Sequence, residues 1–238
     1  MVTARPKRKP VVRVRGGPRG RALSIDGTFA SWYRPGSSLT GSVWDALATP
    51  LLLLPPTRRR AVLVLGLGGG SAARVVRAVA PRARIVGVEH SAQVLQAARR
   101  CFDLDELDVE VVRSDARRYL DRTRRRFDLV IEDVFVGSAR RVRKPNWLPD
   151  PGLTRAARCL HPGGVLVSNS IDETRDVARA MRSLFPSTLR IDVEGYDNRV
   201  VVGGPRPVTA RALRTAVAGH RVLSESLPLF SFRTLERR

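Results

Sequence analysis

The sequence predicts an α/β protein: a Rossmann-like, mostly parallel seven-stranded sheet with helices on both faces, preceded by a small N-terminal β-hairpin piece. Two observations carry this prediction. From residue 61 onward, short apolar runs of strand length alternate with segments of helical periodicity, which is typical of parallel sheets built from β-α-β units. The first run, 61–65, leads into a glycine-rich loop, and the run over 85–88 ends in an acidic residue.

The chain of 238 residues fits one large domain with small appendages. Asp26-Gly27 is a strong hairpin-turn signal, and Pro55 stops the helical pattern that follows it. The expected parts are a basic disordered tail (1–20), a β-hairpin and lead-in helix (21–57), a Rossmann-like nucleoside-binding domain (58–218) and a C-terminal extension without clear pattern (219–238).

Within this organisation, strands and helices are expected to alternate. Strands are predicted over 61–65, 84–88, 108–113, 127–132, 164–169, 188–194 and 199–203. Helices are predicted over 42–54, with a kink at Pro50, and over 71–80, 91–102, 115–121, 150–160, 172–184 and 208–218. The last two strands flank a turn and are expected to pair antiparallel at the edge of the sheet.

The loop after the first strand indicates a site for an adenosine-containing cofactor. Gly66, Gly68 and Gly70 give a GxGxG pattern, and Glu89 follows about 20 residues later, where an acid can accept hydrogen bonds from ribose hydroxyls. Ser71 stands where a dinucleotide fingerprint has its third glycine, which favours an S-adenosylmethionine-type nucleoside over NAD. The alternative is that the glycines only form a tight turn between strand and helix.

Acidic and polar residues follow the other strands, at the edge where ligands bind in open α/β sheets. Asp115, with Ala116 after it, either contacts the adenine amino group or caps the following helix. Asp133 is expected to bind an amine or act as a general base on the incoming nucleophile. Its neighbour Glu132 is a second site acid or, as we favour, the partner of an arginine. Polar residues 168–170 end the next strand.

The composition is strongly basic, with a net charge of +21. Nearly all of the positive charge comes from arginine, because lysine occurs only at Lys7, Lys9 and Lys144. Such a bias is typical of a GC-rich genome, so the arginine clusters are interpreted first as solvated loops. The clusters are also compatible with an acidic partner such as RNA, but nucleic acid is not the favoured partner.

Other features exclude several classes of protein. Cys101 and Cys159 form neither a disulfide framework nor a metal-ligand spacing, so no metal is expected. No apolar run has the length needed to cross a membrane, and residues 1–10 lack the apolar core of a secretory signal. We therefore expect a cytoplasmic protein without a membrane partner.

Five segments resemble the spermidine synthase-like (polyamine aminopropyltransferase-like) branch of the class I S-adenosylmethionine-dependent methyltransferase superfamily. They are VLVLGLGGGSAARVV, IVGVEHSAQVLQAARRCF, VEVVRSDARRYL, FDLVIEDVF and LHPGGVLVSN. The stretch LSIDGTFASWYRPGSSLTGSVWDALATPLLLL is similar to the N-terminal hairpin and lead-in helix of that group, so the likeness covers about 22–203.

The resemblance implies a transferase that uses S-adenosylmethionine or its decarboxylated form, acts on a small-molecule acceptor and functions in polyamine biosynthesis. It implies that Glu89, with His90 after it, holds the ribose and that Asp115-Ala116 holds the adenine. It places Asp133 at the acid that helps to deprotonate the attacking amine. The group often dimerises through its N-terminal piece, which leaves a homodimer open.

Several positions depart from the pattern of that group. The acid expected after the loop glycines is replaced by Ser71-Ala72, the second acid after the fourth strand by Val136, and the glutamine after the hairpin turn by Ala30. Val43-Trp44-Asp45 keeps only the acid of a Tyr-x-Glu pattern, and Thr49 replaces a histidine. Three hypotheses follow: aminopropyl or methyl transfer to a small molecule, an RNA or protein methyltransferase, and a non-catalytic binding protein.

Overall fold

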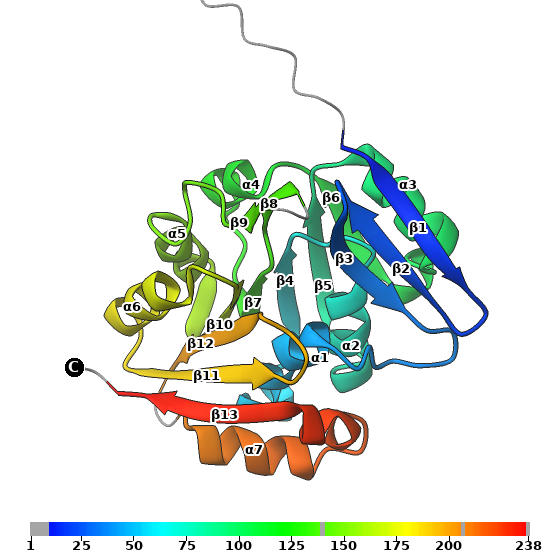
Figure 1. Ribbon diagram of the computed structural model, residues 1–238. Coiled ribbons are helices and arrows are strands. Elements are labelled where there is room, and N and C mark those ends of the chain that lie inside the picture. Colours follow the sequence, from blue (N-terminus) through cyan, green and yellow to red (C-terminus); the bar gives the residue numbers. More distant parts are fainter. Residues whose placement is uncertain (1–9, 139–140, 206–207, 237–238) are drawn as a thin grey trace, which may run out of the picture.

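An eight-stranded sheet forms the centre of the molecule (Figure 1). The computed structural model describes residues 10–138, 141–205 and 208–236. In spatial order the strands of this sheet are β13 (Phe230–Leu235), β11 (Ser187–Val193), β12 (Arg199–Gly204), β10 (Leu160–Ser170), β7 (Phe127–Glu132), β4 (Ala61–Leu65), β5 (Arg84–Glu89) and β6 (Val109–Arg113). The five strands from β10 to β6 are parallel, and the other three are antiparallel. The predicted α/β class is confirmed.

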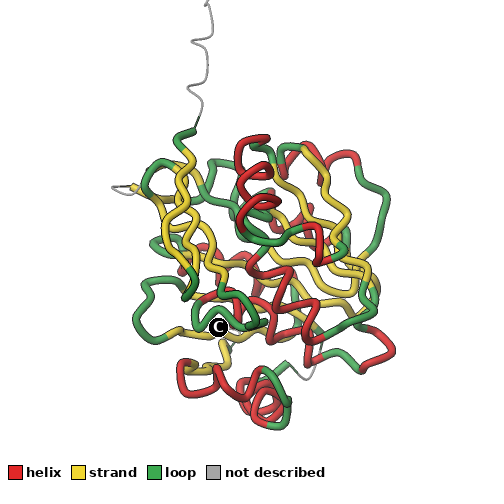
Figure 2. The backbone as a smooth tube through the Cα atoms, turned by 90° about the vertical axis from the view of Figure 1, so that its right-hand side faces the viewer, coloured by secondary structure: helices red, strands yellow, loops and turns green. Residues whose placement is uncertain are grey.

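Helices cover both faces of this sheet (Figures 1 and 2). They are α1 (Val43–Ala48), α2 (Ser71–Val79), α3 (Ala92–Cys101), α4 (Ala116–Arg122), α5 (Gly152–Arg158), α6 (Thr174–Leu184) and α7 (Ala210–Ala218). Side chains of β4 show how the layers form, because Val62 and Val64 pack with α1, α2 and α7, whereas Leu63 and Leu65 pack with α4, α5 and α6. This alternation follows from the two-residue period of a strand.

The N-terminal piece is a three-stranded antiparallel sheet rather than a single hairpin. Its strands are β1 (Val12–Gly17), β2 (Gly20–Ile25) and β3 (Thr28–Tyr33). The predicted Asp26-Gly27 turn is confirmed, with φ of +49° and +82° at its two residues. The sheet packs on α3, where Leu23 and Tyr33 are buried against Val94 and Phe102.

The prediction of a disordered tail over residues 1–20 is wrong for its second half. Residues 12–17 form β1, because their valine-arginine alternation fits a strand and Val12 packs against the small core under β2. The backbone N–H of Val11 also donates to the Asp26 carboxylate at 2.9 Å. Residues 1–9 lie outside the described residues.

The C-terminal extension adds the eighth strand, which corrects the prediction of seven. Residues 223–229 form a 3₁₀ helix, η4 (Leu223–Leu229), and β13 follows it directly. β13 pairs with β11 from Phe230 to Leu235, so the antiparallel pair β11–β12 is not at the edge of the sheet as predicted. β13 escaped prediction because only Phe230 of its six residues is buried, as is usual for an edge strand.

The α-helical part of the lead-in helix is shorter than predicted, and a 3₁₀ helix follows it. α1 ends at Ala48, and a 3₁₀ helix, η1 (Thr49–Leu53), continues it through Pro50. Two further 3₁₀ turns, η2 (Pro56–Arg58) and η3 (Asp105–Leu107), connect other elements, and a short hairpin of β8 (Val136–Ser138) and β9 (Arg141–Arg143) follows β7. No helix in the described part of the chain is long and apolar enough to cross a membrane.

Candidate functional site

The glycine-rich loop joins β4 to α2 at the carboxyl edge of the parallel strands. Gly66, Gly68 and Gly70 have φ of +82°, +55° and +88°, a left-handed conformation that residues with a Cβ rarely adopt. At Gly66 a Cβ atom would also lie 2.4 Å from the backbone carbonyl oxygen of Asp133. The loop therefore needs glycine both for its backbone path and for its close approach to the end of β7.

Glu89 ends β5 beside this loop and is only 6% exposed. Its Oε2 accepts a hydrogen bond from the Gly68 amide at 3.2 Å, and its Oε1 accepts one from the Ser91 amide at 2.9 Å. The His90 Nδ1 lies 3.2 Å from the same Oε1. A carboxylate has about four acceptor positions, so Glu89 keeps capacity at Oε2 for a hydroxyl donor. The structure brings Glu89 and His90 together with the loop.

The N-terminal sheet forms part of the site, because β3 lies on the glycine loop. The Ser31 Oγ accepts a hydrogen bond from the Gly69 amide at 2.7 Å. The Ser71 Oγ accepts one from the Trp32 amide at 2.9 Å and donates one to the Trp32 carbonyl at 2.8 Å. Sequence reasoning missed Ser31, since this contact joins residues 38 positions apart.

Asp115 and Ala116 lie at the neighbouring strand end, between β6 and α4. The backbone there is tied to β5, because the Ser114 amide donates to the Glu89 carbonyl at 3.1 Å. The Asp115 carboxylate accepts a hydrogen bond from the Arg118 amide at 3.0 Å, which confirms its interpretation as an N-cap of α4. Asp115 is exposed, whereas Ala116 is buried. Contact of either residue with adenine stays a prediction.

Asp133 follows β7 directly and is held from two sides. The Trp44 Nε1 of α1 donates to its Oδ2 at 3.1 Å, and the Asn169 Nδ2 of β10 donates to its Oδ1 at 2.8 Å. Asn169 is fixed in turn by the Asn198 Nδ2, which donates to its Oδ1 at 3.0 Å. The half-buried carboxylate therefore has a defined orientation at the sheet edge.

The surroundings of Asp133 make it a better base than an ordinary aspartate. Burial raises its pKa to about 6, although the amide of Asn169, the charge of Lys144 and the indole N–H of Trp44 all act in the opposite direction. The nearby negative charge of Glu132 adds to the increase. Near neutral pH this carboxylate is mostly ionised and still able to accept a proton.

The partner of Glu132 is a lysine, which corrects our expectation of an arginine. The Lys144 Nζ donates to both carboxylate oxygens of Glu132, at 2.8 and 2.9 Å, and to the Val134 carbonyl at 3.1 Å. It also lies 4.0 Å from the centre of the Phe135 ring. Both side chains of the pair are 1% exposed. The pair joins residues 12 positions apart, and no local pattern in the sequence indicates it.

Asp45, the acid retained from the Tyr-x-Glu pattern, is fully buried and already saturated. It accepts hydrogen bonds from the Thr40 amide and hydroxyl, from the Gly41 amide and from the Ser226 hydroxyl, at distances of 2.7 to 2.9 Å. These four donors fill the acceptor positions of a carboxylate. Asp45 therefore anchors the lead-in loop to η4 and does not face a ligand.

Three aromatic residues near the site, Trp44, Phe135 and Trp147, have different partners. Trp44 is at the site through its indole N–H and packs edge-on against Phe29, with ring centroids 5.1 Å apart. Phe135 contacts the ammonium of Lys144, and Trp147 packs against Gly152 of α5. In the described ranges, no group of three His, Cys, Asp or Glu side chains is arranged to hold a metal ion.

The sequence and the fold have counterparts in known proteins. A family model described as a methyltransferase domain matches residues 62–164. A probable polyamine aminopropyl transferase of Bifidobacterium longum is 29% identical over 174 residues, covering 68% of this chain and 37% of that protein. The crystal structure of a probable spermidine synthase from Corynebacterium glutamicum has a TM-score of 0.75 and 21% identity, and the match covers 94% of this chain and 88% of the other.

These matches confirm that the chain resembles the spermidine synthase-like branch of the class I S-adenosylmethionine-dependent methyltransferase superfamily. Another relative of this spermidine synthase-like chain is an eEF1A lysine and N-terminal methyltransferase homolog of Drosophila pseudoobscura, 26% identical over 210 residues, or 77% of this chain and 31% of that protein. The chain thus spans only about a third of the length of these two curated relatives.

Proposed function

We propose that this chain is a transferase that binds S-adenosylmethionine or its decarboxylated form and transfers a methyl or aminopropyl group to a small-molecule acceptor. One observation carries the proposal. The Asp133 carboxylate is oriented by Trp44 and Asn169 at the edge of the sheet, next to the glycine loop. A general base in this position can meet an acceptor that approaches the reactive end of a bound nucleoside.

The residues of the loop fit a nucleoside without a pyrophosphate. Glu89 would hold the ribose with its remaining acceptor capacity, and Asp115 would accept a hydrogen bond from the adenine amino group. A pyrophosphate would need free backbone amides in the glycine loop and at the start of α2. The Gly69 amide is instead bonded to Ser31, which supports an S-adenosylmethionine-type cofactor over a dinucleotide.

In this mechanism the protein mainly positions the acceptor and removes a proton from its nucleophile. When bound, the cofactor supplies a carbon that its sulfonium has already activated for attack. Asp133 would hold the nucleophile of the acceptor in line with that carbon and take up its proton. Trp44 and Asn169 each bond one oxygen of the carboxylate, so that it does not rotate away.

The charges around Asp133 support an acceptor with one amine or hydroxyl group rather than a diamine. A diammonium ion needs several carboxylates to replace its hydration. Lys144 neutralises Glu132, four donors saturate Asp45, and Val136 stands where the group has a second acid. Among the described residues at this strand end, Asp133 is then the carboxylate that stays available to an acceptor.

The similarity to the eEF1A lysine and N-terminal methyltransferase homolog favours a second candidate, methyl transfer to a protein amine. A lysine side chain or an N-terminal amine would present one nucleophilic nitrogen to Asp133, as the charges of the site require. Incubation with isotope-labelled S-adenosylmethionine and separate pools of small amines and proteins would discriminate between the two candidates by where the label appears.

Calorimetry with each form of the cofactor tests the proposal. We expect saturable binding of S-adenosylmethionine or its decarboxylated form, and at least tenfold weaker binding by Glu89→Gln, because the ribose loses a charged acceptor. Glu225→Gln, an exposed position on η4, is the matched control. The preferred form would indicate which group is transferred. If neither form binds, the transferase proposal is wrong and a non-catalytic role replaces it.

A further inference from the structure

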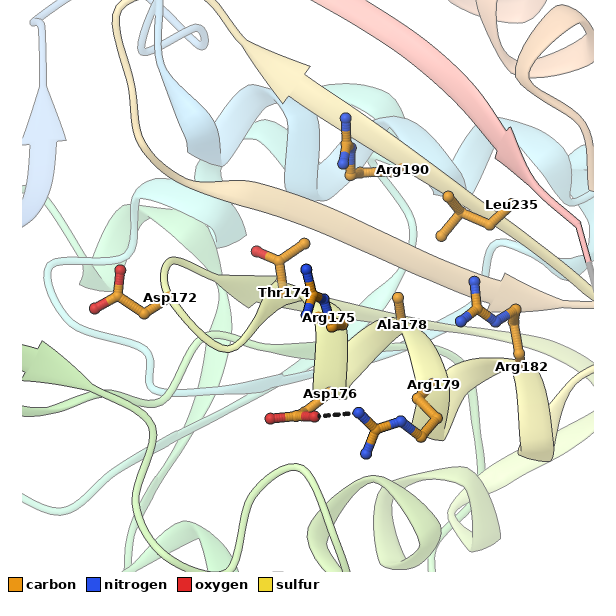
Figure 3. Close-up of a pocket in the computed structure, with 9 residues that line it drawn as sticks. All are labelled: Asp172, Thr174, Arg175, Asp176, Ala178, Arg179, Arg182, Arg190 and Leu235. Atoms are coloured by element: carbon orange, nitrogen blue, oxygen red, sulfur yellow. Dashed lines mark ion pairs between the residues drawn. The ribbon is translucent and has the colours of Figure 1, made fainter. Parts of the chain in front are cut away.

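A basic cavity of about 720 Å³ lies away from the glycine loop, between α6 and the strands β11 and β13 (Figure 3). Four arginines and two aspartates supply its charged lining: Arg175, Arg179, Arg182, Arg190, Asp172 and Asp176. Its volume falls within the range of sites for small ligands, about 300 to 1,000 Å³. The transferase proposal makes no use of this cavity.

Part of its positive charge has no partner. Arg179 forms an ion pair with Asp176 at 2.8 Å (Figure 3). Arg190 forms one with the Asp192 carboxylate at 2.9 Å. Within the described part of the chain, Arg175 and Arg182 form no ion pair or hydrogen bond through their side chains. The Nε of Arg190 is buried and also has no acceptor. The cavity therefore holds two arginines of α6 that no carboxylate of the described residues neutralises, and Arg190 of β11 lines it as well.

The spacing of these donors suits an extended anion. Arg175, Arg179 and Arg182 are four and three residues apart, so they lie along one face of α6. With a rise of about 1.5 Å per residue, the stripe is roughly 10 Å long. Arg190 reaches the cavity from β11, so that an anion lying on the stripe would be contacted from two elements.

We propose that this cavity binds the phosphate groups of an anionic ligand. The planar guanidinium fork of arginine matches the oxygens of a phosphate and forms paired, charge-assisted hydrogen bonds with it. The same chemistry occurs in a free polyphosphorylated small molecule and in the backbone of an RNA strand, which the experiment separates.

The experiment titrates the full chain with tripolyphosphate and, separately, with a short single-stranded RNA. The variant R175A/R182A removes the two unpaired arginines, and R211A/R214A is its control, since it removes the same charge from exposed positions on α7. We expect R175A/R182A to weaken binding by about tenfold or more, and the control to change it by less than about twofold. Circular dichroism would confirm that both variants are folded.

The two probes identify the source of the phosphate. Saturable binding of tripolyphosphate alone indicates a small ligand. Binding of RNA, with a salt dependence whose slope falls by about 1.4 in R175A/R182A, indicates a nucleic-acid strand, because each lost phosphate contact on a single strand contributes about 0.7. Equal weakening in both double variants would show general attraction to a basic surface and would overturn the proposal. Absence of binding by both probes would overturn it as well.

A second variant tests recognition apart from charge. R175K/R182K keeps both positive charges but removes the forked geometry. We expect it to bind the preferred probe several-fold more weakly than the native chain. If R175K/R182K binds the probe as tightly as the native chain does, the cavity attracts the probe by its positive charge alone. That result would contradict specific recognition of phosphate.

Discussion

At Asp133, burial and hydrogen bonding act on one carboxylate in opposite directions, and burial has the larger effect on its pKa. We expect Asp133→Asn to lower the rate of transfer by about 10²- to 10⁴-fold, the usual contribution of a general base. In the native chain the rate should rise with pH through about 6, as Asp133 loses its proton. A pH-rate profile for both proteins measures the effect.

The control for this variant is Asp105→Asn, which removes an exposed carboxylate paired with Arg99. It should keep the native profile. A profile for Asp133→Asn that retains full activity and the same rise near pH 6 would show that another group takes the proton. Calorimetry should find unchanged cofactor affinity in Asp133→Asn, since Glu89 and the loop remain intact.

Stability gives a second readout of the same group. Because the folded-state pKa of Asp133 is raised, its protonated form contributes stability at low pH, which is lost as pH rises through about 6. Asp133→Asn cannot ionise. We expect the free energy of unfolding of this variant, from urea denaturation, to vary less between pH 4 and pH 7, a range set by the ordinary and raised pKa of an aspartate, than that of the native chain.

The Glu132–Lys144 pair leads to a prediction about stability. Lys144→Met would leave the Glu132 carboxylate buried without its cation, although Ser168 and Val134 still donate to it. Breaking a buried pair costs about 3–5 kcal/mol. The double variant E132Q/K144M should recover much of this loss, because no charge stays buried. Urea denaturation checks both values, and an unchanged midpoint for Lys144→Met would contradict the role of the pair.

Local spacing in the sequence was enough to identify some residues of the site and not others. Gly66, Glu89 and Asp133 each lie at the end of a strand, where a short pattern reveals them. Ser31 and Lys144 have partners that are brought to them by the tertiary fold. Their roles depend on how the N-terminal sheet and the segment after β7 fold back, which no local pattern encodes.

At the scale of elements, the glycine loop and the end of β7 fit together through Gly66. We expect Gly66→Ala to destabilise the fold and to abolish cofactor binding, because its Cβ would lie 2.4 Å from a backbone oxygen. Gly195→Ala is a close control, since Gly195 has a φ of +76° but no atom within 4 Å of such a Cβ. Both variants carry the cost of a positive φ. A similar loss in both, by thermal unfolding, would show that crowding at Gly66 is unimportant.

The elements that were predicted well are the buried ones. Every residue of β4 and β7 is buried, β4 is a continuous apolar run, and the predicted bounds of both strands agree with the structure. β1 and β13 were missed because each is an edge strand whose side chains are mostly exposed, so polar and apolar residues mix. The short hairpin of β8 and β9 is also largely exposed.

Over the whole molecule, the N-terminal sheet and α1 are joined to the rest of the chain by contacts at several points. Ser71 bonds Trp32, Trp44 bonds Asp133, and Asp45 bonds Ser226. We therefore expect the two parts to unfold in one cooperative transition. Trp147→Phe would leave two of the three tryptophans of the chain, Trp32 and Trp44, to report on the N-terminal part.

Fluorescence of that variant should change at the same urea concentration as far-ultraviolet circular dichroism, which reports mainly on the larger domain. A lower midpoint by fluorescence would show that the N-terminal sheet and α1 separate first. The native chain, measured by circular dichroism, controls for any effect of Trp147→Phe on overall stability.

The burial of Lys144 also gives this protein an unusual chemical signature. Lysine occurs at only two other positions, Lys7 and Lys9, which lie outside the described residues. With its side chain 1% exposed, Lys144 is protected from amine-directed reagents as long as Glu132 holds it. If the region behind Asp133 opens, an acylating reagent can therefore modify Lys144. A peptide map of the treated protein would detect this modification without any engineered label.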